Sequence, residues 1–100
     1  GYLLAGMVIE RVTGSPYEAW LDSAVLAPLG MTRSTTRFIT QADDSTLAMG
    51  HFDLSTVAPT VAFPVRPAIQ LTTTAEDMAR LARFLVSDGR IGDSVFVDAA

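Results

Sequence analysis

The chain has 100 residues, 49% of them hydrophobic and 18% charged, which favours a folded domain, or a piece of a larger one, over a disordered segment. Its net charge is -4, and its seven cationic residues are all arginines scattered among acids, which disfavours a nucleic-acid surface because phosphates require clustered cations. The absence of cysteine excludes disulfides, thiol nucleophiles and zinc–thiolate sites, and no apolar run reaches the ~20 residues of a membrane span.

Residues 3–12 are apolar around most of a helical circumference, apart from one polar pair. This pattern predicts a helix near 2–13 that is buried rather than lying on a surface. Gly14 is a typical C-terminal stop for such a helix. Gly1 and the residue after it offer no capping side chain, so we expect the chain to begin just before or inside an element, with any leader sequence upstream.

A capping box opens the next predicted helix, with Ser15 as the cap and Glu18 three residues later. Apolar residues then recur at helical spacing, which predicts a helix near 15–27. Proline and glycine within 28–31 end this helix. The leucine and methionine of that segment are expected to pack back under it.

Residues 32–72 are expected to be largely irregular. Three of the five prolines lie within 59–67, which favours an extended, loop-like path through 57–71 with at most edge strands. Asp43 and Asp44 precede a serine, a pattern typical of a turn. Adjacent carboxylates do not face one another across a substrate, so a solvated turn is favoured over a catalytic acid pair.

The clearest element is a helix near 74–88. Thr74 is a suitable cap, and the acids of the first turn complement the positive end of the helix dipole. Glu76 and Arg80 form a favourable i, i+4 pair beside the apolar stripe, and Gly89 closes the helix. The predicted fold class is therefore mainly α with an irregular loop segment in the middle.

Few side chains offer catalytic or ligand-binding chemistry. His51 is the single histidine, and no Gly-x-Ser-x-Gly turn presents a serine to it, so a loop or pocket-edge position is favoured over a general base. One histidine, no cysteine and no spaced acidic loop leave no set of metal ligands. The glycines are isolated and provide no phosphate cradle. No metal or cofactor is expected.

Five blocks of sequence follow one another: GYLLAGMVIERVTG at 1–14, SPYEAWL at 15–21, APLGMT at 27–32, AMGH at 48–51 and LTTTAEDMAR at 71–80. In this order they resemble class C β-lactamase-like enzymes, a superfamily that also holds penicillin-binding DD-peptidases and related esterases. The first block is similar to the helix after the family's Tyr-x-Asn motif, the third to its Pro-Leu-Gly-Met turn and the last to its Ser-Thr-x-x-Asp-Met-Ala-Arg helix start. The resemblance covers roughly residues 1–98.

The sequence departs from this family at two places. His51 replaces the usual tyrosine, and Ile69-Gln70-Leu71 fill a stretch in which the family normally carries glycine before the Ser-Thr cap. We therefore expect the local backbone there to differ. Ser87-Asp88-Gly89 is close to the Ser-Asp-Asn motif of one β-lactamase class, but its place at the end of a helix favours a capping role.

The resemblance implies that residues 1–100 are a piece of a single β-lactamase-like, transpeptidase-like domain, the helical portion of an α/β fold. The parent would be a serine acyl-hydrolase that acts on a β-lactam, peptide or ester through an acyl-enzyme. Because the chain has no lysine, it lacks the Ser-x-x-Lys pair, and alone it is expected to be inactive. Tyr-x-Asn would end just before Gly1, and the Lys-Thr-Gly or His-x-Gly strand would lie beyond Ala100. The alternative is a non-catalytic binding or scaffold module that keeps the fold.

The resemblance also implies that Arg66, Ile69 and Gln70 lie toward the substrate cleft of the parent, because the stretch before the Ser-Thr cap lines the cleft in such enzymes. An ordinary proline-rich surface loop is an equally good interpretation. Family members are often periplasmic or secreted and some are cytoplasmic, so the compartment stays open. In an isolated chain the apolar helix at 3–12 would lose its covering partners, and we expect self-association.

Overall fold

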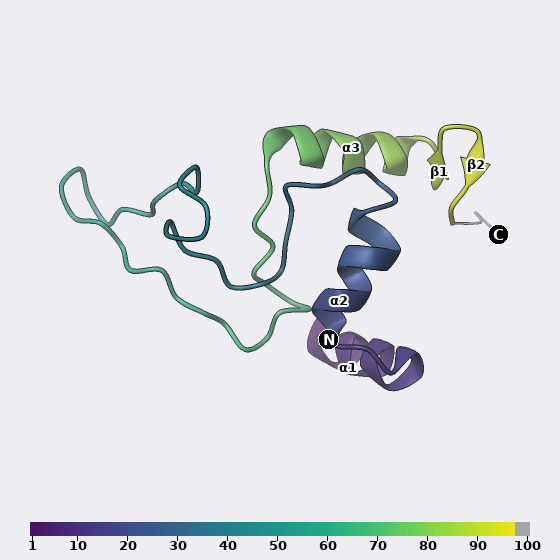
Figure 1. Ribbon diagram of the computed structural model, residues 1–100, viewed down its shortest axis with the longest axis horizontal. Coiled ribbons are helices and arrows are strands. Elements are labelled where there is room, and N and C mark those ends of the chain that lie inside the picture. Colours follow the sequence, from purple (N-terminus) through teal and green to yellow (C-terminus); the bar gives the residue numbers. More distant parts are fainter. Residues whose placement is uncertain (98–100) are drawn as a thin grey trace.

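The computed structural model describes residues 1–97 and shows three α-helices, a π-helical segment and a small hairpin (Figure 1). In chain order the elements are α1 (Tyr2–Thr13), α2 (Tyr17–Leu21), η1 (Asp22–Leu26), α3 (Ala75–Val86), β1 (Arg90–Ile91) and β2 (Ser94–Val95). The expectation about the end of the chain at Ala100 falls outside the described residues. The mainly helical character with an irregular middle, predicted from the sequence, is confirmed.

Helix α1 has the predicted limits but not the predicted burial. Gly14 ends it in the left-handed region, at φ 67°, and donates its N–H to the Glu10 carbonyl at 2.9 Å. Most side chains of α1 are exposed, including Val12 at 79%, and Gly6 is its one buried residue. The prediction of burial is wrong within the described chain, because α1 packs only against α2 and the loop at Pro67.

The second predicted helix exists but is divided into two hydrogen-bonding patterns. Residues Tyr17–Leu21 are α-helical, whereas Asp22–Leu26 form a π-helical turn that closes with the Ala27 N–H donating to the Asp22 carbonyl at 2.9 Å. The apolar periodicity predicted one continuous helix because it does not distinguish these two patterns.

The capping box predicted for this helix does not form. Ser15 makes no side-chain cap, and the free N–H of Tyr17 instead donates to the Glu10 carboxylate at 2.8 Å. Glu18 pairs with Arg66, 48 residues away, rather than turning back to the helix start. The Tyr17 N–H and the Glu18 carboxylate thus both bond to partners outside residues 15–18, and the bond to Glu10 joins α1 to α2.

Residues 32–72 form a long excursion away from the helices (Figure 1). Isolated bridges pair Thr35 with Thr72 at its base and His51 with Val57 near its tip. The turn prediction at 43–45 is confirmed, since the Asp43 carboxylate accepts the Thr40 N–H at 2.7 Å in an exposed position.

Helix α3 matches its prediction closely. The Thr74 hydroxyl accepts the Asp77 N–H at 3.2 Å as the N-cap, and Glu76 pairs with Arg80 at 2.8 Å. At the other end Gly89, at φ 75°, donates its N–H to the carbonyl of Phe84. Residues 87–89 are thus a helix terminus, as expected. The antiparallel hairpin of β1 and β2 follows.

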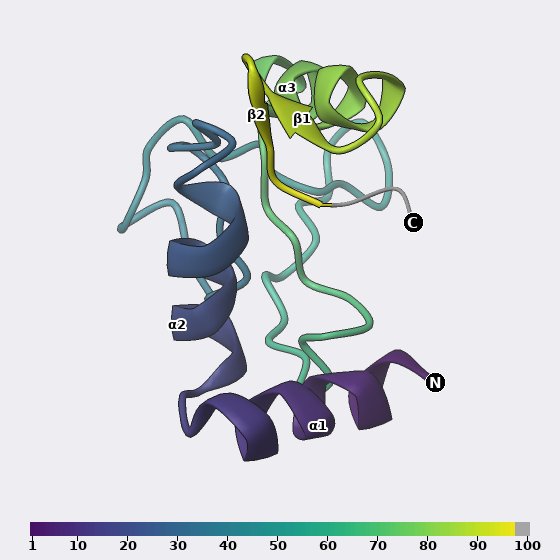
Figure 2. The same ribbon diagram turned by 90° about the vertical axis from the view of Figure 1, so that its right-hand side faces the viewer.

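The core is small. Leu26, Leu29 and Met31 are buried, and partly buried side chains from η1, α3 and β1 pack around them. The expectation that the segment after the second helix packs back is therefore confirmed. Figure 2 shows α2 and η1 standing between α1 and α3. The radius of gyration is 15.6 Å, against about 13 Å for a compact domain of this length, so much of the chain lies outside this core.

None of the helices in residues 1–97 has the length and apolarity needed to cross a membrane. Within the same residues there is also no group of three or more histidine, aspartate or glutamate side chains placed to hold a metal ion.

Candidate functional site

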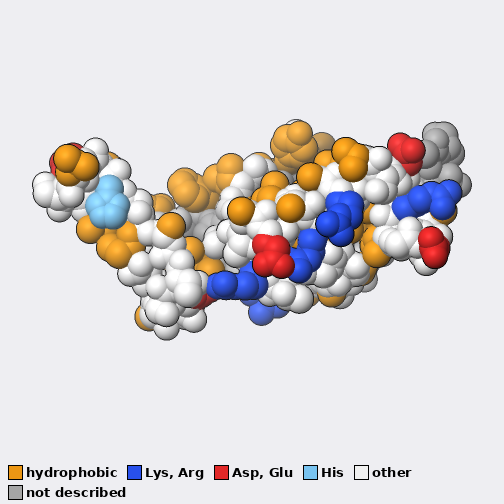
Figure 3. Space-filling view, turned by 90° about the horizontal axis from the view of Figure 1, so that it is seen from above, with side chains coloured by type: hydrophobic (Ala, Val, Ile, Leu, Met, Phe, Trp, Pro, Cys, Tyr) orange, Lys and Arg blue, Asp and Glu red, His pale blue; other side chains and the backbone are white. Residues whose placement is uncertain are grey.

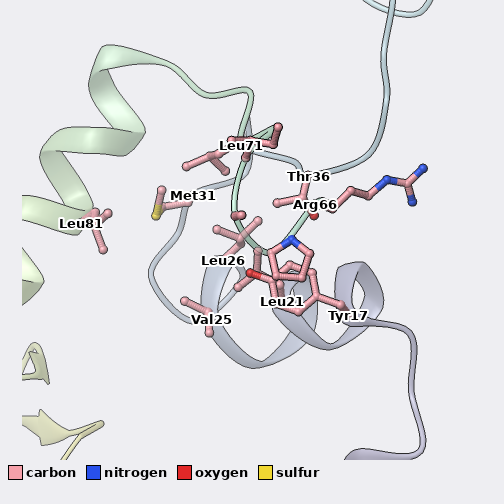
Figure 4. Close-up of a pocket in the computed structure, with 12 residues that line it drawn as sticks. Tyr17, Leu21, Val25, Leu26, Met31, Thr36, Arg66, Leu71 and Leu81 are labelled. Atoms are coloured by element: carbon pink, nitrogen blue, oxygen red, sulfur yellow. The ribbon is translucent and has the colours of Figure 1, made fainter. Parts of the chain in front are cut away.

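An apolar cavity of about 270 Å³, called here the central cavity, lies between the second helix, the loop at 66–71 and α3 (Figure 4). One wall comes from α2 and η1, another from the loop, and Leu81 of α3 closes one side. The lining residues are Tyr17, Leu21, Val25, Leu26, Met31, Thr36, Arg66, Pro67, Ala68, Ile69, Leu71 and Leu81.

The three residues predicted to face a substrate cleft divide between two hollows. Arg66 and Ile69 line the central cavity. Gln70 does not; together with Ile69 it lines a second cavity of about 400 Å³ beside the irregular segment. Ile69 therefore lies between the two hollows. The chain brings all three residues together on one loop, and their contact with a substrate stays a prediction.

An ion pair fixes this loop to the second helix. The Arg66 guanidinium donates to the Glu18 carboxylate, whose side chain is 17% exposed. The hydrogen bond from Arg66 holds the pKa of Glu18 below its usual value. Burial, and then the charge of Glu18, raise the pKa of Tyr17. The pair neutralises the one cation that lines the central cavity.

The backbone at Gln70 has the conformation that glycine favours. Its φ is 87°, in the left-handed region, which costs a residue with a side chain about 1–3 kcal/mol. The Gln70 carboxamide oxygen accepts the N–H of Phe63 at 2.7 Å and so closes the loop between them. We expected the local backbone to differ from that of the family here, because Ile69, Gln70 and Leu71 fill the stretch in which the family carries glycine. Gln70 nevertheless adopts a φ that glycine favours.

A buried carboxylate joins the two ends of the irregular segment. Asp77 is 1% exposed and accepts hydrogen bonds at 2.8 Å from the Arg33 N–H, the Ser34 hydroxyl and the Arg80 guanidinium. Desolvation raises the pKa of this carboxyl, but the bonds from Ser34, Arg33 and Arg80 together outweigh it, so the pKa lies below its ordinary value. The sequence pointed only to its place in the first turn of α3.

The family model described as Beta-lactamase matches residues 1–95, which include all the elements above. The chain belongs to the β-lactamase family. None of the curated proteins compared with the chain is a significant match. The family resemblance stated from the sequence blocks is confirmed.

One buried polar atom of this β-lactamase family chain was not anticipated. Thr36 lines the central cavity and is 3% exposed, and its hydroxyl oxygen has no hydrogen-bond partner. It is the only buried side-chain nitrogen or oxygen in residues 1–97 without one. Sequence offers no signal for this, since nothing in the segment distinguishes Thr36 from its threonine and serine neighbours.

His51 is an exposed loop residue, as expected. Its Nδ1 lies 3.1 Å from the Met49 carbonyl, and it does not line the central cavity. Figure 3 shows it at the far end of the irregular segment, away from the arginines and acids of the helical part.

Residues 1–97 contain no serine or threonine hydroxyl hydrogen-bonded to a histidine or a lysine. The nearest approach to an activated nucleophile is Ser34, whose hydroxyl donates to Asp77 at 2.8 Å and lies 2.7 Å from the Thr73 hydroxyl. An aspartate with a lowered pKa is a weak base, so this contact is structural. In this part of the β-lactamase family chain the side chains can shape a cleft but do not assemble an acyl-transfer site.

Proposed function

We propose that this chain is the central helical portion of a single β-lactamase-like domain whose parent is a serine acyl-hydrolase. The observation that carries the proposal is the family match over residues 1–95. The parent's serine would attack the carbonyl of a β-lactam, peptide or ester and form an acyl-enzyme, and donors placed around the developing oxyanion would stabilise it. Residues outside this chain would supply the nucleophile and its lysine, since the chain has no lysine.

In this proposal the loop at 66–70 forms one wall of the substrate cleft. Glu18 neutralises Arg66, and the Gln70 carboxamide holds the loop closed on Phe63, so both polar side chains position the wall. Ile69, which is 44% exposed, is then the side chain available to contact the acyl group.

The alternative is a non-catalytic binding or scaffold module that retains the β-lactamase-like fold. The lack of a nucleophile with an adjacent base in the described residues is the observation that favours it. A Ser-x-x-Lys motif upstream and a Tyr-x-Asn motif directly before Gly1 in the full gene product would favour the enzyme. Their absence would favour the binding module.

Substitution of Ile69 tests the proposed role of the 66–70 loop as a wall of the substrate cleft. Ile69→Ala in the full gene product should change the ratio of kcat/KM values among nitrocefin, a p-nitrophenyl ester and a D-alanyl-D-alanine peptide by about tenfold or more, because differential contacts decide specificity. Leu54→Ala, at a fully exposed position of the same irregular segment, is the matched control. Unchanged ratios for Ile69→Ala would argue against the wall.

A further inference from the structure

Gln70 has a backbone conformation that is unfavourable for a residue with a side chain. Its φ is 87°, where glycine would be relaxed and glutamine is strained. Residues held in such conformations persist only where the surrounding structure fixes them, and they gather at active sites and at loops that hold ligands. The strain at Gln70 therefore calls for a role of its side chain.

The two polar atoms of the Gln70 carboxamide differ in their surroundings. The oxygen accepts the Phe63 N–H at 2.7 Å, and because a backbone N–H can only donate, this contact fixes which atom is the oxygen. The NH₂ group makes no hydrogen bond within residues 1–97. Thr36 holds the only buried side-chain nitrogen or oxygen without a partner in these residues, so the Nε2 atom of the half-buried Gln70 is accessible to a ligand.

The second cavity, beside the irregular segment, is lined by Gln70 and Ile69 and has a volume of about 400 Å³. Ligand pockets are typically about 300–1,000 Å³ and combine apolar walls with a few polar groups. The other polar side chains of this lining are Thr60 and Thr72, whose hydroxyls can both donate and accept a hydrogen bond. Because its oxygen is already bonded, the Gln70 carboxamide offers only donors, so it selects for a ligand atom that accepts a hydrogen bond.

We propose that the NH₂ group of Gln70 donates a hydrogen bond to a carbonyl oxygen in the side chain of the substrate's acyl group. This inference rests on the proposed hydrolase function and narrows its substrates. Acyl groups that carry an amide or a ketone, such as those of peptides and acylamino β-lactams, are preferred to simple alkanoyl esters. Ile69, which lines the same cavity, contacts the adjoining apolar part of the acyl group. The oxygen of Gln70 thus holds the loop, and its nitrogen binds the substrate.

Two p-nitrophenyl esters of nearly equal size test this role, because the 4-oxopentanoate has a ketone oxygen where the 4-methylpentanoate has a methyl group. With the full gene product, and after division by the rates in buffer, we expect kcat/KM to be about tenfold higher for the 4-oxopentanoate, the effect of one hydrogen bond. Gln70→Glu keeps an oxygen for the Phe63 N–H but has no donor at neutral pH, so it should remove the preference. Gln70→Gly, which is relaxed at this φ, should remove it as well.

Ala42→Glu is the matched control, because it places the same negative charge on an exposed turn of the irregular segment, and it should keep the preference. A second measurement does not depend on turnover. In NMR spectra of the isotope-labelled gene product, the NH₂ signals of Gln70 are identified as the pair absent from both Gln70 variants. These signals should shift on addition of 4-oxopentanamide and stay in place with 4-methylpentanamide.

Equal kcat/KM values for the two esters, a preference that survives in either Gln70 variant, or a preference lost in Ala42→Glu would overturn the proposal. Gln70 signals that do not move with 4-oxopentanamide would also overturn it, and this measurement alone decides if neither ester reacts. Acyl-enzyme formation separates the two ideas. Shifted signals in a gene product that forms no acyl adduct contradict the hydrolase function alone, and an acyl adduct with unmoved signals contradicts the role of Gln70 alone.

Discussion

The carboxylate of Asp77 accepts the backbone N–H of Arg33 at 2.8 Å across 44 residues of sequence. With the reciprocal 2.9 Å bonds between Thr35 and Thr72, this contact joins the start of the irregular segment to its end. The first turn of α3 thereby holds the base of a long excursion whose interior has few such bonds. Asp77 is central to the position of the loop that lines both cavities.

Asp77→Asn is expected to destabilise the chain more than any other single carboxylate-to-amide change. The amide loses the charge that pairs with Arg80, and its NH₂ group cannot accept a hydrogen bond. Urea denaturation is the measurement, with Asp43→Asn, an exposed turn carboxylate, as the control. Equal urea midpoints for the two variants would contradict the role given to Asp77.

The same carboxylate predicts a pH dependence. Because the folded-state pKa of Asp77 is lowered, its contribution to stability is present above the unfolded-state pKa of about 3.9 and is lost as the pH falls through the folded value. The free energy of unfolding should therefore fall from about pH 5 downward, and less steeply for Asp77→Asn. Parallel pH profiles of the two proteins would count against a lowered pKa.

The backbone and the side chain of Gln70 should have opposite effects on stability: the positive φ destabilises the fold, and the hydrogen bond to Phe63 stabilises it. Gln70→Ala keeps the unfavourable φ and loses the bond to Phe63, so it should cost about 1–2 kcal/mol. Gln70→Gly loses the same bond but relieves the strain, and should be about 1 kcal/mol more stable than the alanine variant. Denaturant unfolding of the pair decides this, and an alanine variant as stable as the glycine variant would show that φ is not positive.

Gly6 should tolerate a methyl group only when Pro67 is removed. A Cβ at Gly6 would collide with the ring of Pro67, so Gly6→Ala should destabilise by about 1–3 kcal/mol despite the better helix propensity of alanine. In a Pro67→Gly background, which removes both the Cβ and the Cγ that the added methyl group would meet, the same change should stabilise by about 1 kcal/mol. A double-mutant cycle on melting curves measures the coupling, and additive effects would mean that α1 and the loop are not in contact.

The exposed apolar surface of α1 predicts that the isolated chain of residues 1–100 self-associates. Leu4 and Val12 are both more than half exposed, and such surfaces normally find a partner. Sedimentation at micromolar concentration should show species larger than a monomer. Leu4→Glu and Val12→Glu should reduce them more than Leu54→Glu, at the tip of the irregular segment. A monodisperse monomer with a sharp cooperative melt would contradict this prediction.

Sequence predicted the elements whose signals are local. The limits of α1 and α3, the Thr74 cap and the Gly14 stop follow from residues within a few positions of each other, and all are found. The capping box at Ser15 is wrong because a local motif competes with distant partners: Arg66 takes Glu18 from a position 48 residues away.

The candidate site was less predictable for the same reason. Arg66, Ile69 and Gln70 were brought together by family resemblance, but their division between two cavities depends on the three-dimensional path of the loop. The burial of Asp77 depends on the turn at Arg33, and the isolation of the Thr36 hydroxyl depends on which groups fail to reach it. The spacing of residues along the sequence does not indicate such contacts between distant parts of the chain.

Intact-protein mass spectrometry of the full gene product tests the central claim most directly. Incubation with a β-lactam, an activated ester or a D-alanyl-D-alanine peptide should add the mass of one acyl group for at least one of them, and replacement of the serine of Ser-x-x-Lys by alanine should abolish the adduct. Residues 1–100 alone should form no adduct and turn over no nitrocefin, because they lack lysine. A folded gene product that forms no adduct with any of the three, or an adduct on residues 1–100 alone, would contradict the account.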